Sequence, residues 1–367
     1  MMDTAIIGGG LSGLALAKSL LASQCDFSVY EARNYFGGRI YSVSSTTLAN
    51  LAEQKFKFDL GPSWVWPDFQ PRVARMLRQE NIDVIPQWIK GRSLYQTNKD
   101  IPAQAFVGES PYSSARRIDG GSDRLIAVLL QQIPVASLNL NYQLQKLSDC
   151  GDHVKLQFDV NGEQLIVRSR RVVVTIPPRL IANSIVFEPV LDTQFWSVMK
   201  STTTWMAGHA KAVICYENAF WREADYSGSA YAAYPGAILG EMFDAGTTDG
   251  KIAALAGFFA LPAKLREQYR KDLQTFILSQ LVSLYGEEAA KAEEVFIKDW
   301  AFDQYTATAD DKNIPTSHPE YGHQWLQLDH WNEKLFFAGT ETAREFGGYL
   351  EGALASAERV KDALTYR

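Results

Sequence analysis

The sequence has few cysteines and no long apolar run. Its 367 residues include three cysteines, Cys25, Cys150 and Cys215. Their small, odd number and wide spacing exclude a disulfide framework or a CxxC metal site and favour a reducing compartment. No apolar run reaches the roughly 18 residues that span a bilayer, and no basic segment precedes the short apolar N-terminus. We therefore expect a soluble, cytoplasmic protein without a membrane partner.

Basic clusters and metal-binding patterns are also lacking. Lysine and arginine total 36 against 42 acidic residues, a net charge of -6, which disfavours a nucleic-acid partner. His318, His323 and His330 lie in a proline-containing segment with no cysteine nearby, so we expect no metal site. The length predicts two domains, at about 150 residues each.

The order of the expected elements indicates an α/β fold. A short apolar run at 4–7, a glycine turn, a helix at 11–22 and a β-type run at 27–30 form a βαβ unit. Alternating strands at 138–175 and a final strand–loop–helix at 336–360 follow. We predict a Rossmann-type, glutathione-reductase-like domain from residues 1–66, 118–182 and 331–367, with an inserted α+β substrate domain from 67–117 and 183–330.

The glycine turn has the spacing of a dinucleotide-binding motif. Gly8, Gly10 and Gly13 follow a strand and open a helix, and Glu31 stands 18 residues after Gly13, at the end of the next strand. Such glycines admit a pyrophosphate to the helix N-terminus, and the acid can bind ribose hydroxyls. The alternative is a glycine-rich turn in an ordinary βαβ unit.

Further motifs resemble those of the flavin-containing amine oxidases, the family that includes the monoamine oxidases. They are GGR after Glu31, DLGPSW at 59–64, AKAVICYENAFW at 210–221, and FFAGTET followed by GGYLEGALASAERV at 336–360. The resemblance implies a bound FAD. Carried over to this sequence, it assigns to cofactor binding Gly8, Gly10, Gly13, Glu31, Gly38, Arg39, Gly61, Ser63, Trp64, Leu144, Gly339, Glu341, Tyr349 and Leu350.

Lys211 is the catalytic candidate that this resemblance implies most sharply. The matching lysine in the family reaches flavin N5 through a water molecule, where a cation can assist the reaction with oxygen. Burial beside apolar residues would lower its pKa. Strand periodicity alone would favour the alternative, a strand lysine that points to solvent, and the match of the flanking residues reverses that preference.

The chain departs from the family at the aromatic cage that holds the amine. Tyr349 matches one ring and Trp300 a tryptophan beside the flavin, but Asp310 stands at or near the second ring's place. Trp64, Trp66, Trp300 or Tyr305 could replace that ring, or Asp310 could attract a protonated amine. Ala309 replaces the flavin-linking cysteine of monoamine oxidases, so the expected FAD is non-covalent.

The resemblance implies oxidation of an amine by hydride transfer to flavin N5, with O2 as the final acceptor and H2O2 as a product. Tyr349, Trp300, Trp66 and Asp310 are the expected substrate contacts. The segment 67–117 is short for this family, which leaves room for a bulky or carrier-bound amine. The alternatives are an amino-acid oxidase, which needs a pocket arginine, a desaturase, and an FAD-binding protein without catalysis.

Overall fold

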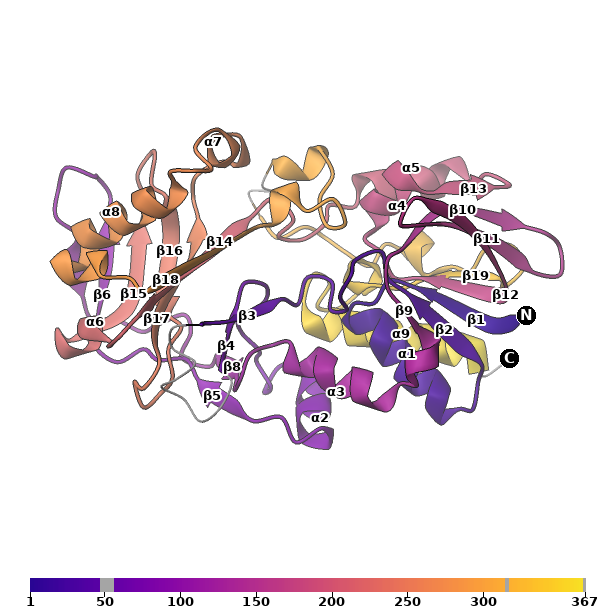
Figure 1. The fold of residues 1–367 in the computed structure, drawn as a ribbon, viewed down its shortest axis with the longest axis horizontal. Coiled ribbons are helices and arrows are strands. Elements are labelled where there is room, and N and C mark those ends of the chain that lie inside the picture. Colours follow the sequence, from indigo (N-terminus) through magenta and orange to yellow (C-terminus); the bar gives the residue numbers. More distant parts are fainter. Residues whose placement is uncertain (47–55, 314–316, 366–367) are drawn as a thin grey trace.

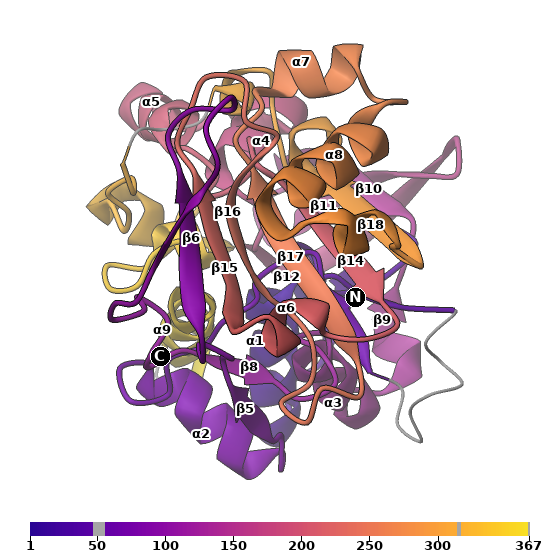
Figure 2. The same ribbon diagram turned by 90° about the vertical axis from the view of Figure 1, so that its left-hand side faces the viewer.

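The computed structural model describes residues 1–46, 56–313 and 317–365. It has two lobes, each built on one large sheet, and both termini lie in the first lobe (Figure 1). Turning the molecule brings the second lobe to the front, with its sheet seen broadside and a helix across it (Figure 2). The expected α/β fold is confirmed.

The first sheet has eight strands in the order β13-β10-β11-β12-β1-β2-β9, with β19 also paired to β12. The strands β12, β1, β2, β9 and β19 run parallel, whereas β10, β11 and β12 form an antiparallel meander. Their bounds are β1 Met2–Ile7, β2 Phe27–Tyr30, β9 Leu138–Asn139, β10 Tyr142–Asp149, β11 Val154–Val160, β12 Glu163–Val174, β13 Val186–Glu188 and β19 Leu335–Phe337.

Helices cover both faces of this sheet. Four helices pack on one face through one apolar core, namely α1 Leu11–Ala22, α2 Pro71–Gln79, α3 Arg124–Gln132 and α9 Leu350–Thr365. Two helices pack on the opposite face through a second core, namely α4 Pro178–Ser184 and α5 Thr193–Ser201.

The second sheet has seven strands in the order β18-β14-β17-β16-β15-β6-β7. Every pair except β15 with β6 is antiparallel. One face packs on helix α8, and the other faces the first lobe through a small apolar cluster. The bounds are β6 Arg92–Gln96, β7 Gln104–Phe106, β14 Ala210–Tyr216, β15 Tyr226–Ala232, β16 Leu239–Asp244, β17 Ala253–Phe259, β18 Glu294–Asp299, α6 Phe220–Glu223, α7 Ala263–Gln268 and α8 Leu273–Tyr285.

Two further antiparallel pairs of short strands lie outside the two large sheets. β3 (Ser42–Ser44) pairs with β4 (Lys57–Asp59), and β5 (Val84–Pro86) pairs with β8 (Arg116–Ile118). The chain enters the second sheet at β6 and again at β14, and it returns to the first sheet after each of these two passages.

The predicted division of the chain differs from this pairing at two places. β13 pairs with β10 and α5 packs its Phe195 and Met199 on the first sheet, although both elements fall within 183–330. Likewise α2, within 67–117, packs its apolar face on the core shared by α1 and α9. The periodicity of a helix or strand shows that one face is buried, but does not show which of two cores buries it.

Glu351, in the first turn of α9, is the carboxylate that joins α9 to α2. It is 0 % exposed and accepts hydrogen bonds from the backbone N–H groups of Arg72 at 3.0 Å and Val73 at 2.9 Å. The Arg72 guanidinium adds an ion pair at 3.2 Å. The side chain thus satisfies N–H groups at the start of α2, which no intrahelical carbonyl can reach.

Glu351→Ala is therefore expected to lower the free energy of unfolding by about 3 kcal/mol, because it leaves the N–H groups at the buried start of α2 without an acceptor. Glu358→Ala is the matched control on the same helix, since Glu358 binds Arg72 and Arg75 with its side chain 43 % exposed. Its cost should stay below about 1 kcal/mol. Urea unfolding followed by circular dichroism measures both, and equal losses would contradict this account of Glu351.

Candidate active site

The glycine turn after β1 brings backbone close to open space. Gly8 has φ +111°, and its N–H donates to the Tyr30 carbonyl at 2.8 Å, which holds the turn against β2. A Cβ on Gly13 would lie 2.0 Å from the Gly8 carbonyl oxygen, so the helix packs directly on the turn. A Cβ on Gly10 would meet only the Gly37 carbonyl, at 3.9 Å. The turn therefore leaves a backbone cradle at the N-terminus of α1.

Glu31 closes one side of this cradle. It is 4 % exposed and accepts hydrogen bonds from the N–H groups of Gly9 at 2.7 Å and Arg33 at 2.9 Å. Arg33 in turn pairs with Asp303. These contacts hold the Glu31 carboxylate at the end of β2, where it faces the space beside the glycines.

A cavity of about 380 Å³ extends from this cradle to the second sheet. It contains residues from both lobes. Of the predicted site residues, the following line it: Gly8, Gly10, Glu31, Gly38, Arg39, Gly61, Ser63, Trp64, Trp66, Leu144, Lys211, Trp300, Gly339, Tyr349 and Leu350. Three predicted residues do not line it, namely Gly13, Glu341 and Asp310.

Gly13 and Glu341 support the cavity from behind. Gly13 lets α1 approach the turn, as described above. Glu341 is buried and forms an ion pair with Arg39 at 2.7 Å. Burial disfavours the charged guanidinium, but Glu341 outweighs that effect, so the pKa of Arg39 is raised. Arg39 therefore remains a fixed cation in the cavity wall.

Asp310 lies outside the site. It is exposed, in the short helix η5 (Asp310–Lys312). The neighbouring Asp311 is buried instead, where it pairs with Arg179 at 2.7 Å and accepts the Thr308 N–H at 2.9 Å. This anchoring of Asp311 turns Asp310 toward solvent. The expectation that Asp310 contacts substrate is therefore wrong for this structure.

Lys211 lies at the far end of the cavity, on β14. It is 2 % exposed, and its ammonium donates to the Ser63 hydroxyl and, at 3.2 Å, to the Gly61 carbonyl. The rings of Phe243 and Phe258 each lie 5.5 Å from Nζ. The alternative of a solvent-facing lysine is excluded.

The pKa of Lys211 is lowered to about 8, chiefly by burial; the Asp59 carboxylate opposes this shift and the nearby Arg117 cation adds to it. Asp59 is itself held by the Ser42 hydroxyl at 2.6 Å and by the Ser122 N–H at 2.8 Å. Lys211 can therefore exist in both charged and neutral forms near physiological pH.

Aromatic rings form the wall around Tyr349. Tyr349 is 38 % exposed, and its ring meets Trp66 edge to face, with 6.5 Å between centroids. On another side His318 stacks parallel to Tyr349 at 5.3 Å, and Trp205 packs on His318 at 4.4 Å. Trp300 is fixed by a hydrogen bond from its indole N–H to the Leu60 carbonyl at 2.9 Å.

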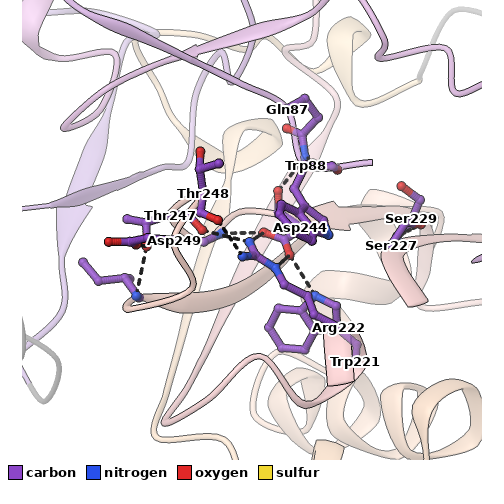
Figure 3. A network of polar contacts seen from close by, with 12 residues as sticks. Gln87, Trp88, Trp221, Arg222, Ser227, Ser229, Asp244, Thr247, Thr248 and Asp249 are labelled. Atoms are coloured by element: carbon purple, nitrogen blue, oxygen red, sulfur yellow. Dashed lines mark hydrogen bonds and ion pairs between the residues drawn. The ribbon is translucent and has the colours of Figure 1, made fainter. Parts of the chain in front are cut away.

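A polar network surrounds Asp244 at the end of β16 (Figure 3), and Gln87 connects it to Trp64. The Trp64 indole donates to Gln87 at 2.9 Å, and the Gln87 amide donates to the Asp244 carbonyl at 2.7 Å. The Asp244 carboxylate is bound at two points by Arg222, at 2.7 and 2.8 Å. Arg222 also stacks on Trp88, 4.1 Å from its centroid. Trp64 is thus connected through Gln87 to the residue that pairs with Arg222, namely Asp244.

Sequence reasoning missed several residues that line the cavity, chiefly Trp205, His209, Phe258 and Gln70. Trp205 and His209 lie in the segment just before Lys211, which no quoted motif includes. Phe258 is the β17 residue directly opposite Lys211. That pairing could be found only by matching the register of two strands more than forty residues apart.

Within the described ranges, no group of three or more His, Cys, Asp or Glu side chains could hold a metal ion. In the same part of the chain, no helix is long and apolar enough to cross a membrane. None of the three cysteines, all of them in described segments, lines the cavity.

Two family models and several curated proteins match this sequence. Residues 104–364 match the family model described as flavin containing amine oxidoreductase, and residues 6–79 match that of the NAD(P)-binding Rossmann-like domain. Amine oxidase [flavin-containing] A of Equus caballus is 24 % identical, covering 98 % of this chain and 84 % of the relative. Amine oxidase [flavin-containing] B of Sus scrofa is 25 % identical, covering 97 % and 85 %.

Solved structures share the fold. Putrescine oxidase, in a structure with putrescine bound, superposes with a TM-score of 0.79 at 16 % identity, covering 100 % of this chain and 99 % of the other. Cyclohexylamine oxidase from Brevibacterium oxydans superposes with a TM-score of 0.76 at 17 % identity, covering 99 % and 98 %. With the family model matching most of its length, this chain belongs to the flavin-containing amine oxidoreductases and uses FAD to oxidise amines.

Proposed function

We propose that this enzyme oxidises an amine to an imine in the cavity between the two sheets, with O2 as the final electron acceptor. The observation that carries the proposal is one continuous cavity that joins the glycine cradle to the buried Lys211. Bound FAD would supply the acceptor of a hydride from the amine's α-carbon and pass the electrons to O2, which yields H2O2.

The cradle fits the dinucleotide half of FAD. Gly10 and Gly38 leave open space around their α-carbons, and the first N–H groups of α1 have no intrahelical partner, as a pyrophosphate requires. Glu31 would take ribose hydroxyls. Leu144, beside the same space, would contact the adenine. Since no cysteine lines the cavity, we propose that FAD is held without a covalent bond through sulfur.

The opposite end of the cavity fits the reacting half of FAD and the amine. Gly61, Ser63, Gly339 and Leu350 are proposed to hold the flavin, and the N-terminus of α9 would favour negative charge there. Lys211 would hold a proton at Nζ close to the reacting atoms. Tyr349, Trp66 and Trp300 would position the amine and exclude water from it.

We propose that the amine is neutral at the point of reaction. Glu31 is the one carboxylate among the described residues that line the cavity, and it lies at the opposite, cradle end. No carboxylate of that described lining would therefore pair with an ammonium beside Tyr349, and the amine must lose its proton before its α-carbon can give up a hydride.

An amino-acid oxidase is less well supported. It would need an arginine free to bind the substrate carboxylate. The two arginines of the described lining are already paired, Arg33 with Asp303 and Arg39 with Glu341. We propose accordingly that the substrate has no carboxylate next to its amine. We also propose that the first sheet with its helices is the FAD-binding domain and the second sheet the substrate domain.

The function is tested by mixing the purified yellow protein with a panel of amines without oxygen. Primary or secondary amines that are substrates should bleach the flavin absorbance, and admission of air should restore it with release of peroxide. Bleaching by amino acids alone would replace amine oxidation with the amino-acid alternative. A protein that takes up no FAD would overturn the proposal.

A further inference from the structure

A second, much smaller cavity adjoins the serine that binds Lys211. Its volume is about 10 Å³, and Ser63 lines both this cavity and the large one. Asp59, Arg117 and Lys57 are its other polar lining residues, and Lys57 is already paired with Asp123. A cavity of about 10 to 15 Å³ holds one water molecule if two to four polar groups surround it. The second cavity therefore has the size of a site for a single water.

Two of the polar groups around this cavity have a hydrogen that no described residue accepts. The Ser63 hydroxyl accepts a hydrogen bond from the Lys211 ammonium, and within the described ranges nothing accepts the hydroxyl's own hydrogen. Arg117 is 6 % exposed and donates from one terminal nitrogen to the Gly246 carbonyl. Its Nε is buried and has no partner in the part of the chain that the structure describes.

The third group, the Asp59 carboxylate, has one oxygen to spare. Oδ1 accepts hydrogen bonds from the Ser42 hydroxyl at 2.6 Å and from the N–H and hydroxyl of Ser122 at 2.8 and 2.7 Å. No described donor reaches Oδ2. A buried polar atom that lacks a partner is costly and rare. One water can satisfy all three groups, because it can accept from Arg117 and Ser63 and donate to Oδ2 of Asp59.

We propose that the second cavity holds one ordered water, which joins Asp59 and Arg117 to Ser63 and hence to Lys211, and that through this network Asp59 keeps Lys211 charged. Asp59 is thus a positioning residue that acts on Lys211 from behind the cavity wall. The water site stands on the second cavity alone, whereas its effect on the reaction with O2 rests on the function proposed above.

The charges around Lys211 require such a link. Burial disfavours the ammonium, the Arg117 cation disfavours it further, and the Asp59 carboxylate is the group that opposes both. Burial likewise raises the pKa of Asp59, and Lys211 lowers it again, so that each of these two groups stabilises the charge of the other. The other charged groups on the adjacent strands are paired, Lys298 with Asp303 on one side and Asp244 with Arg222 on the other.

Asp59→Asn tests the role of the carboxylate. Asparagine keeps an Oδ1 for Ser42 and Ser122 and removes only the charge. The pKa of Lys211, read from the ε-carbon signal of ¹³C-lysine in the FAD-loaded protein and assigned with Lys211→Met, should fall from about 8 by about 1 unit. Asp119→Asn is the control, because Asp119 also acts on Arg117 but does not line the second cavity. It should leave the titration of Lys211 unchanged, and an unchanged titration in Asp59→Asn would refute the role of Asp59.

A crystal structure of the wild-type protein tests the water directly. It should show one water within about 2.7 to 3.2 Å of Arg117 Nε, Asp59 Oδ2 and Ser63 Oγ, and a cavity without density there would overturn the water site. Neither measurement needs an amine or O2. If Asp59→Asn shifts the titration of Lys211 but not the pH profile of reoxidation, the network stands and the proposed role of Lys211 toward O2 fails.

Discussion

Lys211→Met is expected to slow the reoxidation of reduced enzyme by O2 by about 100-fold, with a much smaller effect on reduction by the amine. The buried ammonium is held by Ser63 and the Gly61 carbonyl at the reacting end of the cavity. A cation fixed where negative charge develops typically contributes a factor of about 100 to 1,000. Methionine keeps the length and apolar contacts of the side chain and removes the charge.

The pH dependence gives a second measurement of the same role. The pKa of Lys211 is lowered to about 8, first by burial, so the ammonium is present below that pH and is lost above it. Reoxidation that depends on the cation should therefore slow as the pH rises through about 8. In Lys211→Met this transition should disappear. Stopped-flow absorbance of the reduced protein mixed with oxygenated buffer follows both properties.

Lys264→Met is the control, because Lys264 is an exposed lysine of the same lobe. It should leave the rate and its pH profile unchanged. Wild-type reoxidation rates in Lys211→Met, or an unaltered transition near pH 8, would show that Lys211 only fills space beside Phe243 and Phe258.

Gly10→Ala and Gly13→Ala, three residues apart, are expected to impair different properties of the protein, FAD binding and stability respectively. A Cβ at position 13 would lie 2.0 Å from the Gly8 carbonyl oxygen, so the substitution should cost about 3 kcal/mol of stability. A Cβ at position 10 meets no atom closer than 3.9 Å, and the φ of this residue is -80°. Gly10→Ala should therefore fold normally but weaken FAD binding by about 10- to 100-fold, because the methyl group projects into the cradle.

Urea unfolding and FAD titration by fluorescence quenching separate the two effects. The stability measurement is made without added cofactor, so that FAD binding does not mask it. A Gly10→Ala protein that holds FAD as tightly as wild type would mean that the pyrophosphate lies elsewhere. A Gly13→Ala protein of unchanged stability would show that α1 can move away from the turn.

The sequence was most informative where a motif is contiguous. Local patterns were enough to predict the βαβ unit with Gly8, Gly10 and Glu31, and the C-terminal strand, loop and helix. The glycines and apolar runs of these segments are compatible with one local structure only. Lys211 needed a resemblance, because a strand lysine alone gives no sign of which face it occupies. The structure then showed that face to be buried.

The sequence was least informative where position depends on distant partners. Asp310 turned outward because Asp311 is captured by Arg179, which lies more than a hundred residues earlier. Phe258 lies beside Lys211 in the cavity wall only because of the register between β14 and β17. Neither relation leaves a local pattern that a reading of one sequence could detect.

The cavity that joins the two lobes also has a thermodynamic consequence. Its walls come from the first sheet at Gly8 and from the second at Lys211, so a molecule bound along it recognises the assembled native chain and has no such site in the unfolded chain. By mass action, FAD at about 1,000 times its dissociation constant would add about 4 kcal/mol to the stability of the fold. The amount of this enzyme that survives proteolysis in a cell would then follow the supply of flavin.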